Sequence, residues 1–377
     1  MEMNVETNNH DSFEDMSDVE SLFDDLRDVC RDQLNRYPIM TKGSIIDRLK
    51  PIIKAILLRR SLRADRYFWP NALLAIALEL SHANYGDHKD LDCLMSYYEK
   101  WIDEGLQINC LDNTMNGYSM IYVFQRTKEL KYKDALSKLA NYLFEHPRDK
   151  YGSLPYRTKG ASNIYVDSMG MICPFLSRYG KLTNNQKAVD LAVALLVNYL
   201  KYGIDEKKLL PYHAYNADSK CKLGIIGWGR GVGWLMIGLV DSLEYIDSSH
   251  NQYSILNRAF RDIVDSVIKY QHENGYFSWQ LEALEGPVDT SSTSMVAYAI
   301  RKGINIGLLD ESLSYNTNLA LCALQESTRN AIVGDCSAEC QGLGLYPQKY
   351  DSFPWAVGPT TALLSLSIEQ ETNKPVN

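Results

Sequence analysis

The chain has 377 residues, a net charge of −8 and 45% hydrophobic residues. An acidic protein without a basic stripe is a poor partner for nucleic acid, and no stretch approaches the roughly 20 apolar residues of a membrane span. Neither a linker nor a break in composition divides the chain. We therefore expect one domain over residues 17–377, preceded by a charged segment, residues 1–16, that is too poor in large apolar side chains to fold.

The first 20 residues have neither the basic start nor the apolar core of a secretory signal. The eight cysteines are scattered, mostly within apolar helical stretches, and this pattern favours free thiols in a reducing cytoplasm over a disulfide framework. Cys336 and Cys340 have the wrong spacing for a zinc knuckle and no histidine close by. We therefore expect a cytoplasmic protein without a metal site.

Apolar periodicity predicts a nearly continuous series of helices along the chain. The predicted helices span residues 18–36, 45–60, 70–82, 91–103, 117–127, 132–145, 168–179, 185–201, 233–245, 253–271, 291–303, 316–327 and 360–369. Helices that are apolar nearly all round, such as 70–82 and 360–369, alternate with amphipathic ones such as 185–201 and 253–271. The first kind is typical of a buried helix and the second of a superficial one. Strand-like alternation is limited to three short hairpins, expected around 152–156, 209–215 and 275–279.

Six times an aromatic- or glycine-rich loop with a polar group runs directly into an apolar helix, at residues 67–72, 111–117, 165–171, 227–234, 288–295 and 353–359. Repetition at this scale indicates a helical unit that buries its apolar face against its neighbours. Six inner helices ringed by outer ones predict an all-α fold, the (α/α)6 barrel. The six helix starts would then gather carboxylates, indoles and an arginine in one cleft, as in a sugar-binding site.

Asp167 is the strongest catalytic candidate because it immediately precedes an apolar helix and is flanked by apolar bulk, which raises the pKa of a carboxyl group. An ordinary N-cap is the alternative, although Ser168 could fill that role. Asp112 repeats the arrangement in the preceding unit, and two facing carboxylates are typical of a glycosidase site. For Asp289, which precedes a Thr-Ser-Ser-Thr-Ser run, capping is the favoured interpretation.

The glycine-rich passage 227–234 matches neither phosphate-binding signature, and no strand precedes it. Trp228 and Trp234 offer stacking faces, and Arg230 offers a two-pronged donor suited to a carboxylate. The alternative is that both indoles are core residues and that Arg230 forms a structural ion pair. His213, beside several aromatic residues, is either a ligand-binding group or an isolated hydrogen-bonding residue.

These motifs, in this order, resemble the unsaturated glucuronyl and rhamnogalacturonyl hydrolases, with the rhamnogalacturonyl branch the closer match. The resemblance runs from about Trp69 to Leu364 and includes the Val166-Asp167-Ser168 passage, His213-Ala-Tyr215, the passage 227–234 and the start of the last helix. The chain departs from the family pattern at three positions, namely Asn216, Val232 and Asp289, and the sugar next to the uronate therefore stays open.

The resemblance implies an (α/α)6 barrel without a metal or organic cofactor. It implies action on lyase-generated oligosaccharides, whose unsaturated uronic acid is released by hydration of its C4=C5 double bond. Asp167 would then be the proton donor and Asp112 its assistant. The substrate-binding residues would be Trp69, His213, Trp228, Arg230, Trp234 and Trp355.

Three other functions use this kind of barrel. An N-acyl-sugar epimerase needs a pair of basic histidines, and only His213 lies near the expected cleft. A non-catalytic carbohydrate-binding or polysaccharide-assembly protein has no need to keep both Asp112 and Asp167. A zinc-dependent cyclase is a third user of this barrel, but its Cys/Cys/His spacing does not occur in the sequence.

Overall fold

The computed structural model describes residues 16–36, 66–157 and 162–368. The helix predicted at 45–60 and nearly all of the N-terminal segment expected to be unfolded lie outside these residues.

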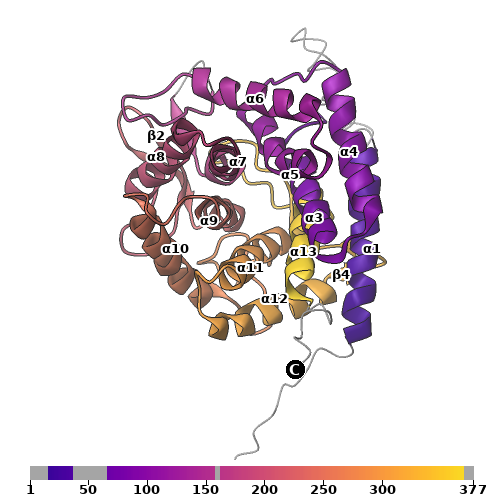
Figure 1. The fold of residues 1–377 in the computed structure, drawn as a ribbon. Coiled ribbons are helices and arrows are strands. Elements are labelled where there is room, and N and C mark those ends of the chain that lie inside the picture. Colours follow the sequence, from indigo (N-terminus) through magenta and orange to yellow (C-terminus); the bar gives the residue numbers. More distant parts are fainter. Residues whose placement is uncertain (1–15, 37–65, 158–161, 369–377) are drawn as a thin grey trace, which may run out of the picture.

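The described helices form two concentric rings (Figure 1). The inner ring contains α3 (Trp69–Tyr85), α5 (Gly117–Thr127), α7 (Asp167–Thr183), α9 (Gly229–Leu243), α11 (Thr290–Asn305) and α13 (Pro354–Ser367). The outer ring contains α1 (Met16–Asn35), α4 (His88–Asp103), α6 (Leu130–Glu145), α8 (Gln186–Tyr202), α10 (Tyr253–Val267) and α12 (Ser314–Glu326). Three short 3₁₀ helices complete the helical elements of the described residues, namely η1 (Leu111–Asn116), η2 (Ile268–Tyr270) and η3 (Glu311–Leu313).

The ring closes because α13, the last inner helix, packs against α3, the first, while α1 covers the two from outside. Burial follows the sequence pattern. Twelve of the residues of α13 are buried, whereas α10 buries only one stripe, which runs from Leu256 to Val267. The prediction of an (α/α)6 barrel is therefore confirmed.

Glycines let neighbouring inner helices approach closely. A Cβ atom on Gly229 would lie 2.1 Å from Ser292 Oγ, and one on Gly170 would lie 2.6 Å from the Trp234 ring. Such distances are far inside van der Waals contact, so any larger residue would push α9 away from α11 or α7. Gly229 and Gly233 of the passage 227–234 thus serve helix packing, whereas Gly227 adopts a positive φ in the turn before α9.

Two predicted helix starts were wrong by several residues. Helix α9 begins at Gly229 instead of Gly233, and α13 begins at Pro354 instead of Thr360. In α9, Gly229 and Gly233 are helical residues that pack on α11. In α13 proline occupies a position in the first turn, where its missing N–H costs no hydrogen bond. The passages read as loops therefore contribute first turns to the inner helices.

Of the three expected hairpins, only the one near 209–215 contains a strand among the described residues. Strand β2 (Tyr212–Asn216) pairs with β1 (Asn163–Tyr165) and β3 (Lys222–Ile226) in an antiparallel sheet. Near 152–156 the chain makes a turn closed by Asp149, and near 275–279 it bonds to distant segments, with Gly229 N–H donating to Trp279 O. Two further pairs, β4 (Thr328–Arg329) with β5 (Ile332–Val333) and β6 (Cys336–Ser337) with β7 (Tyr350–Asp351), precede α13.

The C-terminal halves of the inner helices hold a buried ionic cluster. Lys302 of α11 lies 2.9 Å from Asp241 Oδ1 and 2.8 Å from Glu244 Oε2, and Arg178 of α7 pairs with Glu79 of α3. Because these charges come from four inner helices, the cluster ties the barrel together at the end opposite the helix starts.

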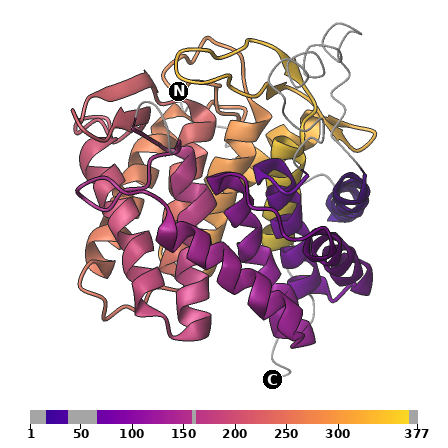
Figure 2. The same cartoon turned by 90° about the horizontal axis from the view of Figure 1, so that it is seen from above.

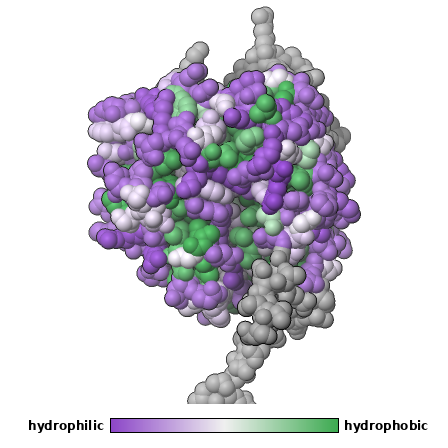
Figure 3. Space-filling model, viewed as in Figure 1, coloured by the Kyte–Doolittle hydropathy of each residue, from purple (hydrophilic) through white to green (hydrophobic). Residues whose placement is uncertain are grey.

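Polar residues predominate on the face shown in Figure 3. None of the helices among the described residues combines the length and apolarity needed to cross a bilayer.

Candidate active site

The starts of α3, α7 and α9 border a cavity of about 210 Å³ that is open to solvent. It lies at the end of the barrel that carries the strands and long loops (Figure 2). Its lining consists of Trp69, Tyr156, Arg157, Tyr165, Asp167, Met171, His213, Trp228, Arg230, Trp234, Glu339, Cys340, Gln341 and Gly342. One catalytic candidate and five substrate-binding candidates from the sequence therefore meet in one place.

Asp167 is the first residue of α7, and its side chain is 17% exposed. Strand β1 leads into this position, and the N–H of Val166 donates to His213 O, which fixes β2 beside the helix start. Asp167 Oδ2 lies 3.4 Å from His213 Nε2, and no described residue donates a hydrogen bond to this oxygen. The side chain does not cap its helix. The carboxyl group is therefore available to a ligand in the cavity.

His213 is buried among aromatic rings and faces Asp167. Its ring lies 4.6 Å from the Trp228 ring and 5.3 Å from the Tyr165 ring, centroid to centroid. Burial favours the neutral imidazole, but Asp167 and the thiol of Cys340 outweigh burial and raise the pKa of His213 from 6.5 to about 9. At neutral pH the Asp167–His213 pair therefore retains a proton.

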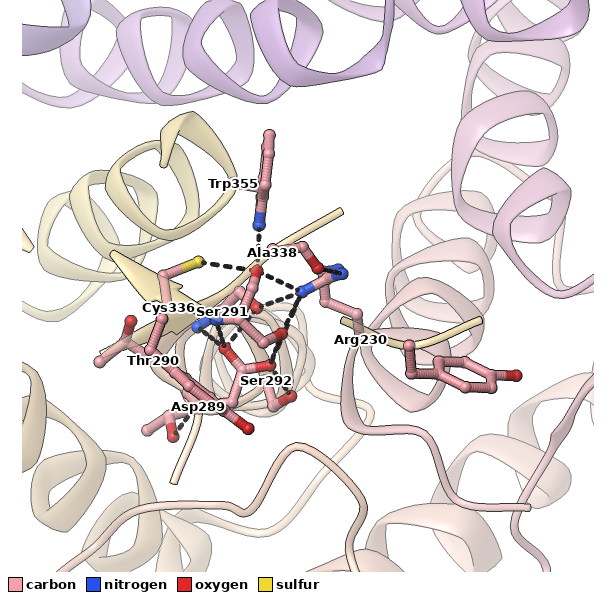
Figure 4. Close-up of polar contacts among 12 residues, drawn as sticks. Arg230, Asp289, Thr290, Ser291, Ser292, Cys336, Ala338 and Trp355 are labelled. Carbon is pink, nitrogen blue, oxygen red and sulfur yellow. Dashed lines mark hydrogen bonds and ion pairs between the residues drawn. The ribbon is translucent and has the colours of Figure 1, made fainter. Parts of the chain in front are cut away.

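Arg230 has two environments. Its guanidinium lies over the Trp228 ring at the cavity, yet it also donates to Ser291 Oγ at 3.1 Å and to Ala338 O at 2.8 Å. Asp289 lies 3.8 Å away, and Figure 4 shows both residues within one network. With two further bonds to Ser337 O and Oγ, Nη1 makes four of the five polar contacts and Nη2 makes one, whereas a guanidinium carries five N–H groups. Arg230 is thus a structural ion-pair residue that also borders the cavity.

Asp289 caps α11, as the sequence indicated. Its carboxylate accepts hydrogen bonds from Ser291 N and Oγ, from Ser292 Oγ and from Ser337 N and Oγ (Figure 4). These bonds join the start of α11 to β6, which leads into the cavity residues Glu339 to Gly342. The other two departures from the family pattern are also structural. Asn216 caps a turn through Ser219, and Val232 is fully buried in α9.

Indoles form one wall of the cavity. Trp69 packs edge-on against Trp234 at 5.7 Å between centroids and also contacts Trp355 at 5.0 Å. Trp355 itself is 5% exposed, stacks on Phe353 and donates from Nε1 to Ser337 O. It therefore supports Trp69 and is absent from the described cavity lining.

Asp112 lies in η1, is 7% exposed and is likewise absent from the described lining. Tyr156, which borders the cavity, donates a hydrogen bond of 2.8 Å from its hydroxyl to Asp112 Oδ2. Burial and the Asp112 carboxylate both raise the pKa of Tyr156, so this phenol stays protonated. Asp112 is thus linked to the cavity through a hydroxyl group.

The sequence analysis missed four polar or charged features of the cavity: Arg157, Glu339, Gln341 and the thiol of Cys340. Arg157 follows the turn at 152–156, and the others precede β7 in a segment without helical periodicity. The glycines at 342 and 344 were the available signal, since both adopt positive φ in a loop. Among the described residues, no group of three or more His, Cys, Asp or Glu side chains is placed to hold a metal ion.

Comparison with known proteins agrees with this geometry. A family model described as Glycosyl Hydrolase Family 88 matches residues 53–369. The chain belongs to this family. It is therefore a glycoside hydrolase, and the family resemblance seen in the sequence is confirmed.

Individual relatives are distant. The chain is 20% identical over 264 residues to the unsaturated rhamnogalacturonyl hydrolase YesR of Bacillus subtilis, covering 68% of this chain and 74% of the relative. A crystal structure of a possible GH105 member from Klebsiella pneumoniae superposes with a TM-score of 0.80 at 17% identity, over 94% of each chain. The unsaturated glucuronyl hydrolase of Bacillus sp. GL1 gives a TM-score of 0.71 at 16% identity, over 93% of this chain and 96% of that one. These two structures support the barrel fold.

Proposed function

We propose that this glycoside hydrolase releases an unsaturated uronic acid from the non-reducing end of lyase-generated oligosaccharides by hydrating the C4=C5 double bond. The observation that carries the proposal is the Asp167–His213 pair, a cavity carboxyl group next to an imidazole that holds a proton at neutral pH. Hydration of a vinyl ether needs a proton donor for one carbon and water for the next, and one such pair can serve both steps.

In the proposed reaction, Asp167 gives its proton to C4, and the π electrons of the double bond form the new C4–H bond. The positive charge that develops at C5 is shared with the ring oxygen. Water then bonds to C5 and returns a proton to Asp167. The resulting hemiketal opens to a ketone at C5, and the hemiacetal left at C1 expels the neighbouring sugar.

The other residues bind and orient the substrate in this proposal. Trp69, Trp228 and Trp234 present indole faces to the sugar ring, and Arg230 attracts the uronate carboxylate. Trp355 acts by holding Trp69, and Asp112 assists through the hydroxyl of Tyr156. An epimerase would need a second basic histidine, and His213 is the only histidine in the described lining.

We also propose that residues 17–377 form a single catalytic domain, because α1 and α13 at the two ends of this range pack on the same inner helix, α3. A cytoplasmic location fits the cysteines. All eight are free thiols, and burial raises the pKa of Cys30 to about 12 and that of Cys93 to about 11.

The decisive test is loss of the ultraviolet absorbance of the unsaturated uronate on a panel of lyase products with different second sugars. Products ending in rhamnose are the first choice, given the similarity to a rhamnogalacturonyl hydrolase. We expect turnover of at least one unsaturated disaccharide and none of its saturated counterpart. An enzyme that cleaves the saturated sugars instead would overturn the proposal.

A further inference from the structure

Tyr346 brings a segment outside the helix ring into contact with His213. It belongs to residues 338–349, which connect β6 to β7, and its hydroxyl oxygen lies 2.7 Å from His213 Nδ1. The backbone N–H of Ile225 in β3 donates to the same oxygen at 3.3 Å. Tyr346 is absent from the described cavity lining, so its route to the substrate runs through the histidine.

The two ring nitrogens of His213 therefore face different partners. Nε2 points to Asp167 Oδ2 at 3.4 Å and to Cys340 Sγ at 3.8 Å, whereas Nδ1 points to Tyr346. The hydrogen bond at one nitrogen of a histidine decides which nitrogen gives up a proton. Proton transfer between His213 and Asp167 therefore depends on the hydrogen-bond partner of His213 Nδ1.

The phenol oxygen is suited to accept a hydrogen bond from Nδ1. It has two lone pairs and one proton, and Ile225 N–H already donates to one lone pair. The second lone pair can receive Nδ1–H of the imidazolium, and a bond from a charged donor is stronger than one from a neutral donor. The bond therefore favours the protonated ring.

We propose that Tyr346 is a positioning residue that keeps a proton on Nδ1 of His213, so that the imidazolium passes its other proton, on Nε2, to Asp167. In this step the Nε2–H bond breaks, an O–H bond forms on Asp167, and both charges are neutralised. The neutral ring keeps its Nδ1–H bonded to Tyr346. The inference rests on the proposed function, in which Asp167 is the acid.

The other titratable groups around His213 come from α7 (Asp167), from β1 (Tyr165) and from residues 338–349 (Glu339 and Cys340). Asp167 of α7 and Cys340 favour the charged ring, and burial against Trp228 and Tyr165 opposes it. Glu339 borders the same cavity. None of these groups contacts Nδ1 in the described residues, so a change at Tyr346 reaches His213 through that nitrogen. It also removes the acceptor of the Ile225 N–H in β3.

The test compares Tyr346→Phe with a matched control, Tyr350→Phe. Phenylalanine keeps the ring that packs 5.9 Å from Trp228 and 6.0 Å from Trp279 and removes only the hydroxyl. Tyr350 lies in the same part of the chain, and its hydroxyl donates to the side chain of Gln348 on the exposed side. Both variants lose one hydroxyl, but only one loses the contact with His213.

The His213 imidazole is titrated by NMR in enzyme without substrate, and kcat and KM are measured across pH. In Tyr346→Phe we expect the midpoint of the imidazole titration and the basic limb of kcat to fall together by about one pH unit. We expect kcat to drop about 10-fold with KM nearly unchanged, and Tyr350→Phe to behave as wild type.

Two results would overturn the inference. An unmoved imidazole midpoint would show that Tyr346 does not hold Nδ1. A lowered midpoint with an unmoved pH profile would show that the proton of His213 does not reach Asp167 during turnover. Neither result alters whether the wild-type enzyme consumes unsaturated substrates, so a failure here is distinct from a failure of the proposed function.

Discussion

The hydroxyl of Tyr156 donates to Asp112 Oδ2 at 2.8 Å, and the phenol, unlike the carboxylate, belongs to the described cavity lining. A substrate hydroxyl can therefore form a hydrogen bond with the Tyr156 oxygen, while the Asp112 carboxylate polarises the Tyr156 hydroxyl from the side away from the cavity. Asp112 would thus act on the substrate through two short hydrogen bonds, one between Tyr156 and Asp112 and one between Tyr156 and the substrate, instead of through a direct contact. The contribution of the Tyr156–Asp112 hydrogen bond to catalysis can be measured, because either side chain can be substituted without changing the shape of the other.

Tyr156→Phe and Asp112→Asn should each lower kcat/KM by roughly 10- to 100-fold, because a hydrogen bond to a charged group contributes about 1.5–3 kcal/mol. The double variant should cost little more than the more severe single one, since both changes break the same link. Tyr165→Phe, whose ring packs 5.1 Å from that of Tyr156, serves as the comparison and should have a smaller effect. Additive losses in the double variant would show that Asp112 and Tyr156 act separately.

Asp167→Asn should lower kcat by about 10²- to 10⁴-fold, because an amide cannot donate the proton. The same change removes the charge that raises the pKa of His213, so the imidazole should titrate well below its wild-type value of about 9.

The Asp167–His213 pair should also make stability depend on pH. In the wild type the pKa of His213 in the folded protein exceeds its value of 6.5 in the unfolded chain. The stabilisation from this pair is therefore complete below pH 6.5 and is lost as pH rises through about 9. Urea denaturation between pH 6 and 10 should show this loss in the wild type and a weaker one in the variant.

Arg230→Ala should destabilise the fold as well as weaken binding, because it leaves Asp289 and Ser337 of a buried network without their cation. Arg230→Lys keeps the charge and should raise KM for a free uronate more than for its methyl ester. Ser291→Ala keeps the cation, removes one bond to Arg230 together with the hydroxyl's bond to Asp289, and is the matched control. Equal responses of acid and ester to Arg230→Lys would exclude Arg230 as the partner of the carboxylate.

Isotopes should reveal which bond breaks. In oxygen-18 water, the label should enter C5 of the uronate-derived product when it is read before the ketone exchanges. In deuterium oxide, deuterium should enter C4. A direct glycosidase attacks C1 and leaves C4 unlabelled. Mass spectrometry of the early product distinguishes the two routes, and an unlabelled C4 would rule out hydration.

Lys302→Met should lower the free energy of unfolding by about 3–5 kcal/mol, because it leaves Asp241 buried without its cation. Lys131→Met is a matched control. Lys131 also pairs with two carboxylates, those of Glu99 and Glu129, but at the surface, where the cost should be about 0–1 kcal/mol. Similar denaturation midpoints for the two variants would contradict the prediction that breaking the buried ion pair costs more stability than breaking the exposed one. The kcat of folded Lys302→Met enzyme should stay near that of the wild type, because the cluster lies at the opposite end of the barrel.

The sequence predicted the barrel because alternating helix character is a local signal that tertiary contacts reinforce. It also located Asp167, which lies in a short motif at the start of an inner helix, and it named His213 from the aromatic residues beside it. It could not distinguish a helical first turn from a loop at Gly229, because Gly229 and Gly233 are explained by their close contacts with α11. Glycine has a low intrinsic helix propensity, so the sequence pattern alone argues against a helix at these positions. Packing against α11 overrides that propensity.

The parts of the site that the sequence did not predict depend on pairings between distant segments. Tyr346 meets His213 across 133 positions of the chain, and Arg230 meets Ser337 across 107. No periodicity marks residues 338–349, so nothing local relates them to the cavity. The hydrogen bond between Tyr156 and Asp112 is equally invisible, because the turn at 152–156 was expected to be a hairpin.

The last inner helix supports a wall of the cavity that the first one forms, since Trp355 of α13 contacts Trp69 of α3. A growing polypeptide that has left the ribosome only as far as α12 therefore has its acid, its histidine and most of its indoles, yet the support of Trp69 is still missing. Catalytic competence should consequently appear late in synthesis, in one step, when residues 354–367 emerge and dock. Nascent chains stalled at successive lengths would show activity switching on at that point instead of rising gradually.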